Sequence, residues 1–232
     1  PDLSLIEKAE RLRQKVGNTP IHHFTRLFRK KGVQLFAKKE WRQLSGSVKC
    51  RAAYFIFRYA LEKGLITEGK NLLDATSGNT GIAYAAIGRE LGIGVTLCLP
   101  ENASEERKTI LRSLGAEVVL TSRFEGTDGA QQVAREMAET EPHKYYYADQ
   151  YRNDNNWKAH YHTTAMEITR EIPSITHFVA GLGTTGTFVG TGRRLRKEMP
   201  GVKLISLQPD SALHALEGWK HLETAIVPGI YD

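Results

Sequence analysis

Short apolar segments and helix-length amphipathic segments alternate along this chain from about residue 33 to residue 207. The expected strands are 33–37, 71–75, 95–99, 118–120, 145–148, 177–180 and 202–207. The expected helices are 48–63, 81–91, 104–114, 130–139, 157–171 and 187–197. Because parallel strands are joined by crossover helices, this order predicts an α/β fold with largely parallel sheet.

The composition is that of an ordinary soluble globular protein. The chain has 232 residues, of which 41% are hydrophobic and 25% charged, enough for one large domain or two modest ones. No apolar run approaches the length that crosses a bilayer, and no signal peptide is visible, so no membrane partner is expected. The two cysteines, Cys50 and Cys98, give no disulfide framework, and we expect a cytoplasmic protein.

The net charge of +6 raises the question of a nucleic-acid partner. The basic residues gather near the N-terminus, at Arg26, Arg29, Lys30, Lys31, Lys38 and Lys39. We interpret this cluster as a solvated surface that draws anionic metabolites, and expect no nucleic-acid binding.

One lysine stands in an unusual setting. Lys49 follows Ser45-Gly46-Ser47-Val48, where small residues give close access to the backbone. Most lysines near a helix start are surface charges. The helix that follows is apolar on several sides, however, so an amine at its edge would be desolvated. Desolvation lowers the pKa of an amine and favours its nucleophilic form.

A second motif, Thr76-Ser77-Gly78-Asn79-Thr80-Gly81, is a turn of small residues that leads from a strand into a helix. Backbone N–H groups at such a helix start favour a carboxylate or a phosphate. The alternative is structural, with the glycines shaping a tight turn and the hydroxyls capping the helix. The turn alone leaves both interpretations open. A further polar loop, 149–152, follows the strand 145–148.

A third motif, Gly181-Leu182-Gly183-Thr184-Thr185-Gly186-Thr187, has the Gly-x-Gly-x-x-Gly spacing of a dinucleotide fingerprint. Such a site needs an acidic residue at the end of the next strand, where this chain has Gln208 and Pro209. The threonine hydroxyls suit a phosphomonoester better. We therefore favour a phosphate cradle over a dinucleotide site.

Parallel sheets bind ligands beyond the carboxyl ends of their strands, and all three polar loops are expected at one such edge. A desolvated lysine and a phosphate cradle are what the aldehyde cofactor pyridoxal phosphate requires. The histidines do not predict a metal site, because His160 and His162 stand two apart on an expected helix and face different directions. No metal is expected.

Together these motifs resemble the fold-type-II pyridoxal-phosphate enzymes, most closely the cysteine synthases (O-acetylserine sulfhydrylases) and the catalytic core of cystathionine β-synthase. The likeness begins at Gly17-Asn18-Thr19-Pro20 and runs to the C-terminus. It implies two three-layer α/β domains of the tryptophan synthase β type. The smaller domain would comprise 43–152, with a mobile part at about 95–139, and the larger would comprise 1–42 and 153–232.

The resemblance also implies roles for individual residues. Lys49 would carry the cofactor and act as the catalytic base. Asn79 would meet the 3′ oxygen of the cofactor, and its phosphate would be held by Gly183, Thr184, Thr185, Gly186 and Thr187. The substrate carboxylate would be held by Thr76, Ser77, Gly78, Thr80 and Gln150.

The sequence departs from the family pattern in four places. Cys50 stands where the family usually has Asp, and Gln43-Leu44 replaces Asn-Pro before the lysine motif. Thr185 replaces a glycine and must adopt a backbone angle that a β-branched residue tolerates. The chain ends at Asp232, so the C-terminal part of the larger domain is expected to be truncated, with the partner of the pyridine nitrogen in the missing tail.

The implied activity is a β-replacement on an O-activated L-serine, such as O-acetylserine with sulfide. Serine or O-phosphoserine as donor, and a thiol or an amine as acceptor, stay open, as does a cystathionine β-synthase-like reaction. The resemblance also implies a homodimer. Two alternatives of a different class are a non-catalytic homologue with a regulatory or scaffolding role and a nucleotide-dependent oxidoreductase.

Overall fold

The computed structural model describes residues 2–27, 29–76 and 78–211. The strands are β1 (Ile21–Phe24), β2 (Leu35–Lys38), β3 (Asn71–Ala75), β4 (Val95–Pro100), β5 (Glu117–Thr121), β6 (Tyr145–Tyr147), β7 (His177–Gly181) and β8 (Lys203–Leu207). The α-helices are α1 (Leu3–Leu12), α2 (Lys49–Glu62), α3 (Asn79–Leu91), α4 (Glu105–Ser113), α5 (Gly126–Thr140), α6 (Asn155–Ala159), α7 (Ala165–Glu171) and α8 (Gly186–Glu198). Short 3₁₀ turns cover Arg13–Lys15 and Glu40–Arg42, and a π-helical turn, His160–Thr164, joins α6 to α7.

The predicted alternation of strands and helices is confirmed, and most element boundaries fall within a few residues of the expected ones. The pattern missed α1 and β1, which lie before the region where the alternation begins. The expected helix 157–171 begins at Asn155 and contains the π-helical turn. A π-helical turn leaves the helix continuous, so the spacing of apolar residues in the sequence does not reveal it.

The largest sheet has four parallel strands in the order β5-β4-β3-β6. Successive side chains of a strand point to opposite faces, so the side chains of β3 pack into two different cores. Leu72 packs into the core formed with α2 and α3, whereas Leu73 and Ala75 pack with Ala130 and Ala134 of α5. This part of the chain is therefore a three-layer α/β unit.

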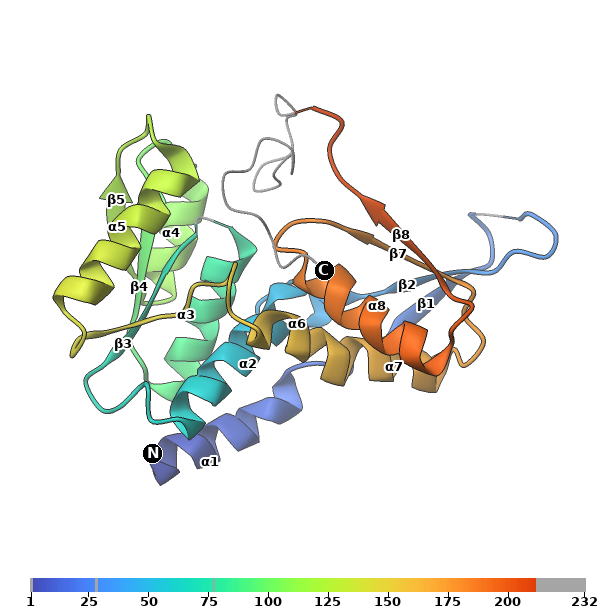
Figure 1. Cartoon of the computed structure of the whole chain (residues 1–232), viewed down its shortest axis with the longest axis horizontal. Helices are drawn as coiled ribbons and strands as arrows, with labels where there is room; N and C mark the ends of the chain where they lie inside the picture. The colour runs from blue at the N-terminus through green and yellow to red at the C-terminus, as the bar shows by residue number, and fades with distance from the viewer. Residues whose placement is uncertain (1, 28, 77, 212–232) are drawn as a thin grey trace.

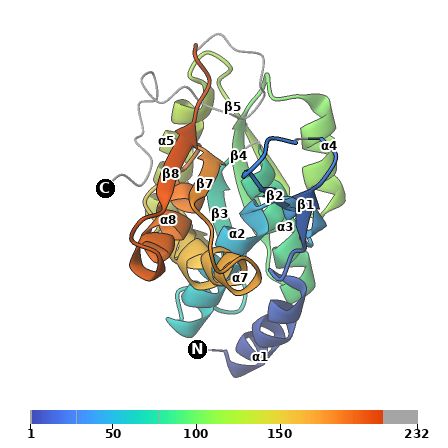
Figure 2. The ribbon, with the colours of Figure 1, turned by 90° about the vertical axis from the view of Figure 1, so that its right-hand side faces the viewer.

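Figures 1 and 2 show how the layers are arranged, with α1 at the base of the molecule beside α2 and α3. The α2 and α6 helices lie between the four-stranded sheet and the part that contains β1, β2, β7 and β8. The sheet and its helices fall inside 43–152, the segment predicted for the smaller domain. The domain boundaries themselves stay a prediction, and 212–232 lies outside the described residues.

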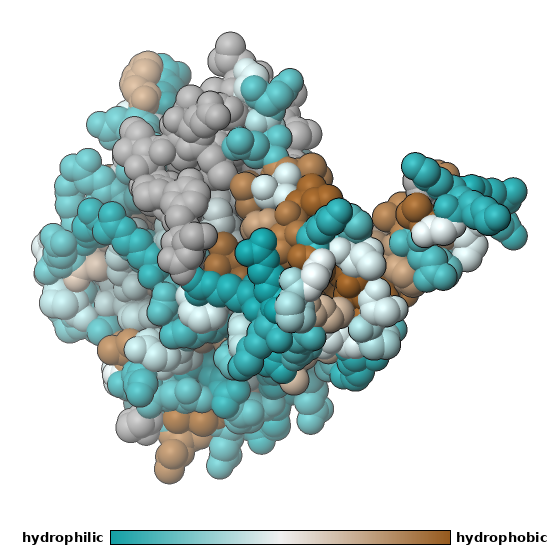
Figure 3. Space-filling model, turned by 45° about the vertical axis from the view of Figure 1, so that its right-hand side comes forward, coloured by the Kyte–Doolittle hydropathy of each residue, from teal (hydrophilic) through white to brown (hydrophobic). Residues whose placement is uncertain are grey.

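The rest of the described chain contains two small sheets. The β1 and β2 strands pair antiparallel and form a hairpin that projects from the body (Figures 1 and 3). The β7 and β8 strands pair in parallel, and one face of their sheet packs on α7 and α8 through Phe178 and Leu204. The other face exposes Val179, Ile205 and Leu207.

The polar loops leave the carboxyl ends of β3, β6 and β7. The first two belong to the four-stranded sheet, and the third belongs to the β7–β8 sheet. The expectation that all three lie on the rim of one sheet is therefore wrong, because the strand pattern cannot show which strands pair.

Among the described residues, no helix is long and apolar enough to cross a membrane.

Candidate active site

Lys49 begins α2, directly after the small-residue turn that contains Gly46. That turn needs glycine because the backbone of Gly46 has φ +73°, in the left-handed region. The Lys49 side chain is half-buried, and burial lowers the pKa of its amine. The desolvation predicted from the apolar helix is confirmed.

The Lys49 amine reaches the turn after β7. A Cβ atom at Gly183 would lie 4.0 Å from Lys49 Nζ, so the open side of this glycine faces the amine. The turn runs into the N-terminus of α8, where backbone N–H groups favour an anion. A primary amine beside a turn whose backbone N–H groups favour an anion fits a phosphorylated aldehyde, and the described residues therefore fit pyridoxal phosphate.

The turn after β3 is packed tightly against its own helix. A Cβ atom at Gly81 would lie 3.0 Å from the Thr76 carbonyl oxygen, so the close approach of helix and strand requires glycine there. The Thr76 hydroxyl accepts a hydrogen bond from the Gly78 N–H at 3.2 Å, which shows that it shapes the turn. Asn79 begins α3 and is exposed. Ser77 lies outside the described residues.

Gln150, after β6, meets this turn from the neighbouring strand. The Thr80 hydroxyl donates to Gln150 Oε1 at 2.7 Å, and both side chains are buried. Because Gln150 Oε1 accepts from Thr80, the Nε2 N–H groups of Gln150 are the part of the amide that can donate to a carboxylate. The structure brings the two residues together as the resemblance implies, and Thr80 orients Gln150. Their contacts with substrate stay a prediction.

Asn156 joins the two binding loops, and the sequence analysis missed it. Its Nδ2 donates to the Gln150 carbonyl oxygen at 2.9 Å and to Thr184 Oγ1 at 2.8 Å. A Cβ atom at Gly186 would lie 2.1 Å from Asn156 Oδ1, so this glycine leaves the room that the amide occupies. Thr80, Gln150, Asn156 and Thr184 thus form one hydrogen-bonded chain between the loops. The sequence showed that these loops follow strands, but it did not show that Asn156 connects them.

His160 is a second residue whose place the sequence did not show. Its ring is fully buried, with Nδ1 2.9 Å from Thr164 Oγ1 and Nε2 3.2 Å from Thr187 Oγ1. Burial holds the pKa of His160 well below its usual value, and the charges of Arg51 and Lys49 add to this. A neutral imidazole therefore contacts Thr187 at the end of the 183–187 turn. Among the described residues, no group of three or more His, Cys, Asp or Glu side chains could hold a metal ion.

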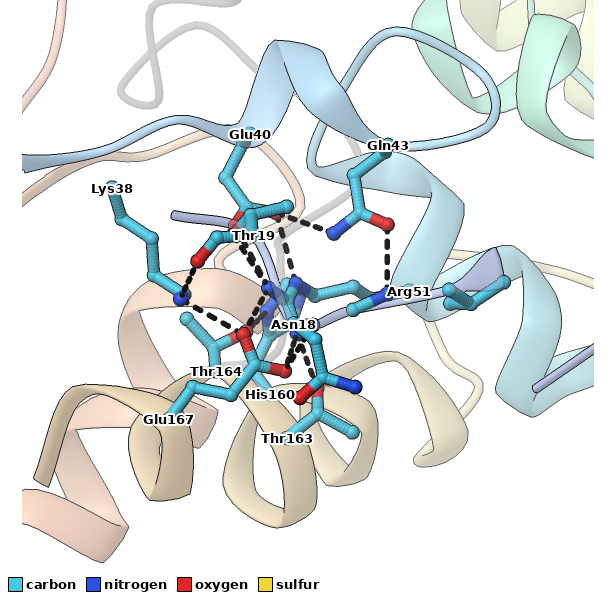
Figure 4. Close-up of polar contacts among 12 residues, drawn as sticks. Asn18, Thr19, Lys38, Glu40, Gln43, Arg51, His160, Thr163, Thr164 and Glu167 are labelled. Atoms are coloured by element: carbon cyan, nitrogen blue, oxygen red, sulfur yellow. Dashed lines mark hydrogen bonds and ion pairs between the residues drawn. The ribbon is translucent and has the colours of Figure 1, made fainter. Parts of the chain in front are cut away.

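Two residues after Lys49, the fully buried Arg51 anchors α2 to the neighbouring elements (Figure 4). Its guanidinium donates to both Glu40 oxygens at 2.8 Å and to the two Glu167 oxygens at 2.7 and 2.8 Å. Thr19 and Thr163 accept further hydrogen bonds from it. The arginine thereby joins the start of α2 to α7 and to the turn after β2.

The charges in this cluster balance each other. Lys38 Nζ lies 2.8 Å from Glu167 Oε2, which gives two cations for the two carboxylates. Burial by itself would raise the pKa of Glu167, but hydrogen bonds from Arg51 and Lys38 lower it to about 2. Glu167 Oε1 also accepts from the Asn18 N–H at 2.9 Å, which fixes the Gly17–Pro20 segment beside the site.

Thr185 has a left-handed backbone with φ +66° and ψ −13°. The expectation that its backbone suits a β-branched residue is wrong, because a Cβ atom in this region crowds the following carbonyl oxygen. The residue is buried within a hydrogen-bonded turn, and the turn imposes the strained angle.

We expect Thr185→Gly to raise the free energy of unfolding of the apoprotein by about 1 kcal/mol, since relief of strain exceeds the entropy cost of glycine. Urea denaturation measures the change. Thr184→Gly is the matched control and should destabilise, because Asn156 loses its acceptor. A loss of stability in Thr185→Gly would show that its side-chain contacts outweigh the strain.

The family model described as pyridoxal-phosphate dependent enzyme matches residues 12–231. The chain belongs to this family, and its cofactor is pyridoxal 5′-phosphate. Membership favours the phosphate-cradle interpretation of the 181–187 turn over a dinucleotide fingerprint.

Within the family, the chain is similar to the cysteine synthase of Aquifex aeolicus, with 48% identity over 96% of this chain and 69% of that enzyme. A crystal structure of cysteine synthase (OASS) from Entamoeba histolytica superposes with a TM-score of 0.86 at 30% identity, covering 94% of this chain and 68% of that one. The O-acetylserine dependent cystathionine β-synthase of Helicobacter pylori gives a TM-score of 0.81 at 35% identity, covering 90% and 72%. The predicted fold class and family are confirmed.

Proposed function

We propose that this chain catalyses a β-replacement on an O-activated L-serine, with O-acetylserine and sulfide as the substrates that give L-cysteine and acetate. One observation carries the proposal. The Lys49 amine faces Gly183, and a hydrogen-bonded chain from Thr184 through Asn156 leads to Gln150 and Thr80. These contacts support a site for an aldehyde cofactor next to a site for an amino-acid carboxylate.

When bound at Lys49, the cofactor supplies an electron sink that acidifies the Cα–H bond of the substrate. Once the substrate amino group has taken the place of Lys49 on the cofactor aldehyde, the released Lys49 amine would accept the Cα proton as general base and later return it to the product. Its lowered pKa makes the free amine available closer to neutral pH than an exposed lysine would be. Acetate leaves Cβ with the electron pair of the C–O bond, and hydrosulfide forms the new C–S bond.

The two loops have separate tasks in this proposal. The turn at 183–187 holds the cofactor phosphate through its amides and threonine hydroxyls, while Asn79 meets the cofactor ring. The turn at 76–80 and Gln150 hold the substrate carboxylate. Fixing the carboxylate orients the Cα–H bond toward Lys49, and this orientation decides which bond breaks.

Further features are proposed from the family resemblance. Binding of the carboxylate closes the segment 95–139 over the site and excludes water. The enzyme acts as a homodimer in the cytoplasm, with small-molecule substrates and no nucleic-acid partner. A cystathionine β-synthase-like reaction is the second candidate, favoured by the likeness to the Helicobacter pylori enzyme.

The visible absorption of the purified protein with pyridoxal phosphate tests the proposal. We expect a yellow protein in which borohydride reduction attaches the cofactor to Lys49, as located by peptide mass spectrometry. Addition of O-acetylserine should shift the absorption, and subsequent addition of sulfide should release cysteine. A protein that takes up the cofactor but yields no product with any donor and acceptor would identify a non-catalytic homologue.

A further inference from the structure

Asp74 is a buried carboxyl at the junction of the two substrate-binding loops. Its side chain belongs to the penultimate residue of β3 and is 1% exposed. Oδ1 accepts from the Ala75 N–H at 2.8 Å, and Oδ2 accepts from the Gln150 N–H at 3.3 Å. One carboxyl thus contacts the backbone on both sides of the proposed carboxylate site.

This junction follows from the strand pairing. The β3 and β6 strands run in parallel, with Leu73 opposite Tyr147, so the loops that follow them leave the sheet side by side. The Ala148 N–H donates to the Leu73 carbonyl oxygen at 2.8 Å, and Asp74 adds the next bridge between the strands. The position of Gln150 relative to the 76–80 turn therefore depends on this side chain.

The surroundings of Asp74 bring its ionisation close to neutral pH. Burial raises the pKa of this carboxyl to about 7 and the negative charge of Asp149 adds to the shift, whereas the hydrogen bonds from the Ala75 and Gln150 N–H groups oppose it. The other titratable groups that face it are Tyr84 of α3, Cys98 of β4, Tyr146 and Tyr147 of β6, and Tyr151. Burial raises the pKa of each of them, so they are uncharged near neutral pH.

We propose that Asp74 is a positioning residue that sets Gln150 against the 76–80 turn, and that ionisation of Asp74 weakens the binding of the substrate carboxylate. The inference rests on the proposed function, because it takes these loops as the carboxylate site. Ionised Asp74 places a second negative charge directly behind loops that receive an anion, in a buried region where charges are poorly screened.

The test measures ligand binding to the holoenzyme from its visible absorption between pH 6 and pH 8.5, with L-serine as the probe. The variant is Asp74→Asn, which keeps the shape and stays neutral but can accept only one of the two backbone hydrogen bonds, so the comparison is between the pH dependences and not the absolute affinities. We expect the ratio of the two dissociation constants, wild type over variant, to rise on the order of tenfold across this range. The remote Asp2→Asn should behave as the wild type. Identical profiles for wild type and Asp74→Asn would overturn the inference.

A second measurement needs no variant. L-serinamide carries an uncharged amide in place of the carboxylate, so its binding should lack the contribution of Asp74. The ratio of the two dissociation constants, L-serine over L-serinamide, each corrected for the fraction of ligand whose amine is uncharged, should rise with pH in the wild type. A constant ratio would contradict the inference even if Asp74→Asn fails to fold. Neither measurement requires turnover, so a failed β-replacement and a failed role for Asp74 give different results.

Discussion

Lys49→Ala is expected to lower kcat by about 10³-fold while leaving the fold intact, because the variant loses the general base. The cofactor should also be lost on gel filtration, since no amine remains to hold it covalently. Steady-state cysteine formation and the visible absorption after desalting measure the two effects. Circular dichroism of the apoprotein should match that of the wild type, because the Lys49 side chain lies at the edge of the core.

Lys63→Ala is the matched control for this substitution. Lys63 caps the other end of α2 and is exposed, so its removal should change neither kcat nor cofactor retention. Partial recovery of Lys49→Ala activity by an added primary amine would support the role of base. Near-normal turnover in Lys49→Ala without added amine would remove the assigned role.

Arg51→Met is expected to destabilise the protein by about 3–5 kcal/mol, because it leaves Glu40 and Glu167 without their principal buried partner. The free energy of unfolding from urea titration of the apoprotein measures this loss. Arg58→Met on the same helix is the matched control. Arg58 pairs with Glu10 and Glu62 at a partly exposed surface, so its loss should cost less than about 1 kcal/mol.

The pH dependence of the free energy of unfolding tests the same buried cluster around Arg51. The pKa of Glu167 is about 2 in the folded protein, below its ordinary value of 4.5. The stability contributed by a carboxyl with a lowered pKa is complete above the unfolded value and is lost as the pH falls. The loss should therefore occur between about pH 4.5 and 2 in the wild type. In Arg51→Met the pKa of Glu167 is no longer held as low, so the free energy of unfolding should fall less between these pH values, and an unchanged fall would contradict the assignment.

Local sequence patterns were sufficient for much of the fold. The spacing of apolar residues identified β3, α3 and β4, because one face of each element must be buried whatever its neighbours are. The glycines at 46 and 81 marked turns and close approaches that other residues do not permit. The short motifs around Lys49 and the two turns carried the family resemblance, which the comparisons confirmed.

Other features depended on contacts between segments that are far apart in the sequence. No local pattern indicates that Asn156 bridges Gln150 and Thr184, since the three residues come from separate loops. The buried cluster of Arg51 draws partners from residues 19 to 167, and each of them looks like an ordinary surface residue in isolation.

Apolar periodicity and turn chemistry act over a few neighbouring residues, so the strand and helix segments, the family and the three motifs could be predicted from the amino-acid sequence. Three features emerged only in the folded chain: the turns belong to two separate sheets, the Lys49 amine faces Gly183, and Thr185 is held at positive φ. Strand pairing and side-chain packing set these features, and both depend on interactions between residues that only folding brings together.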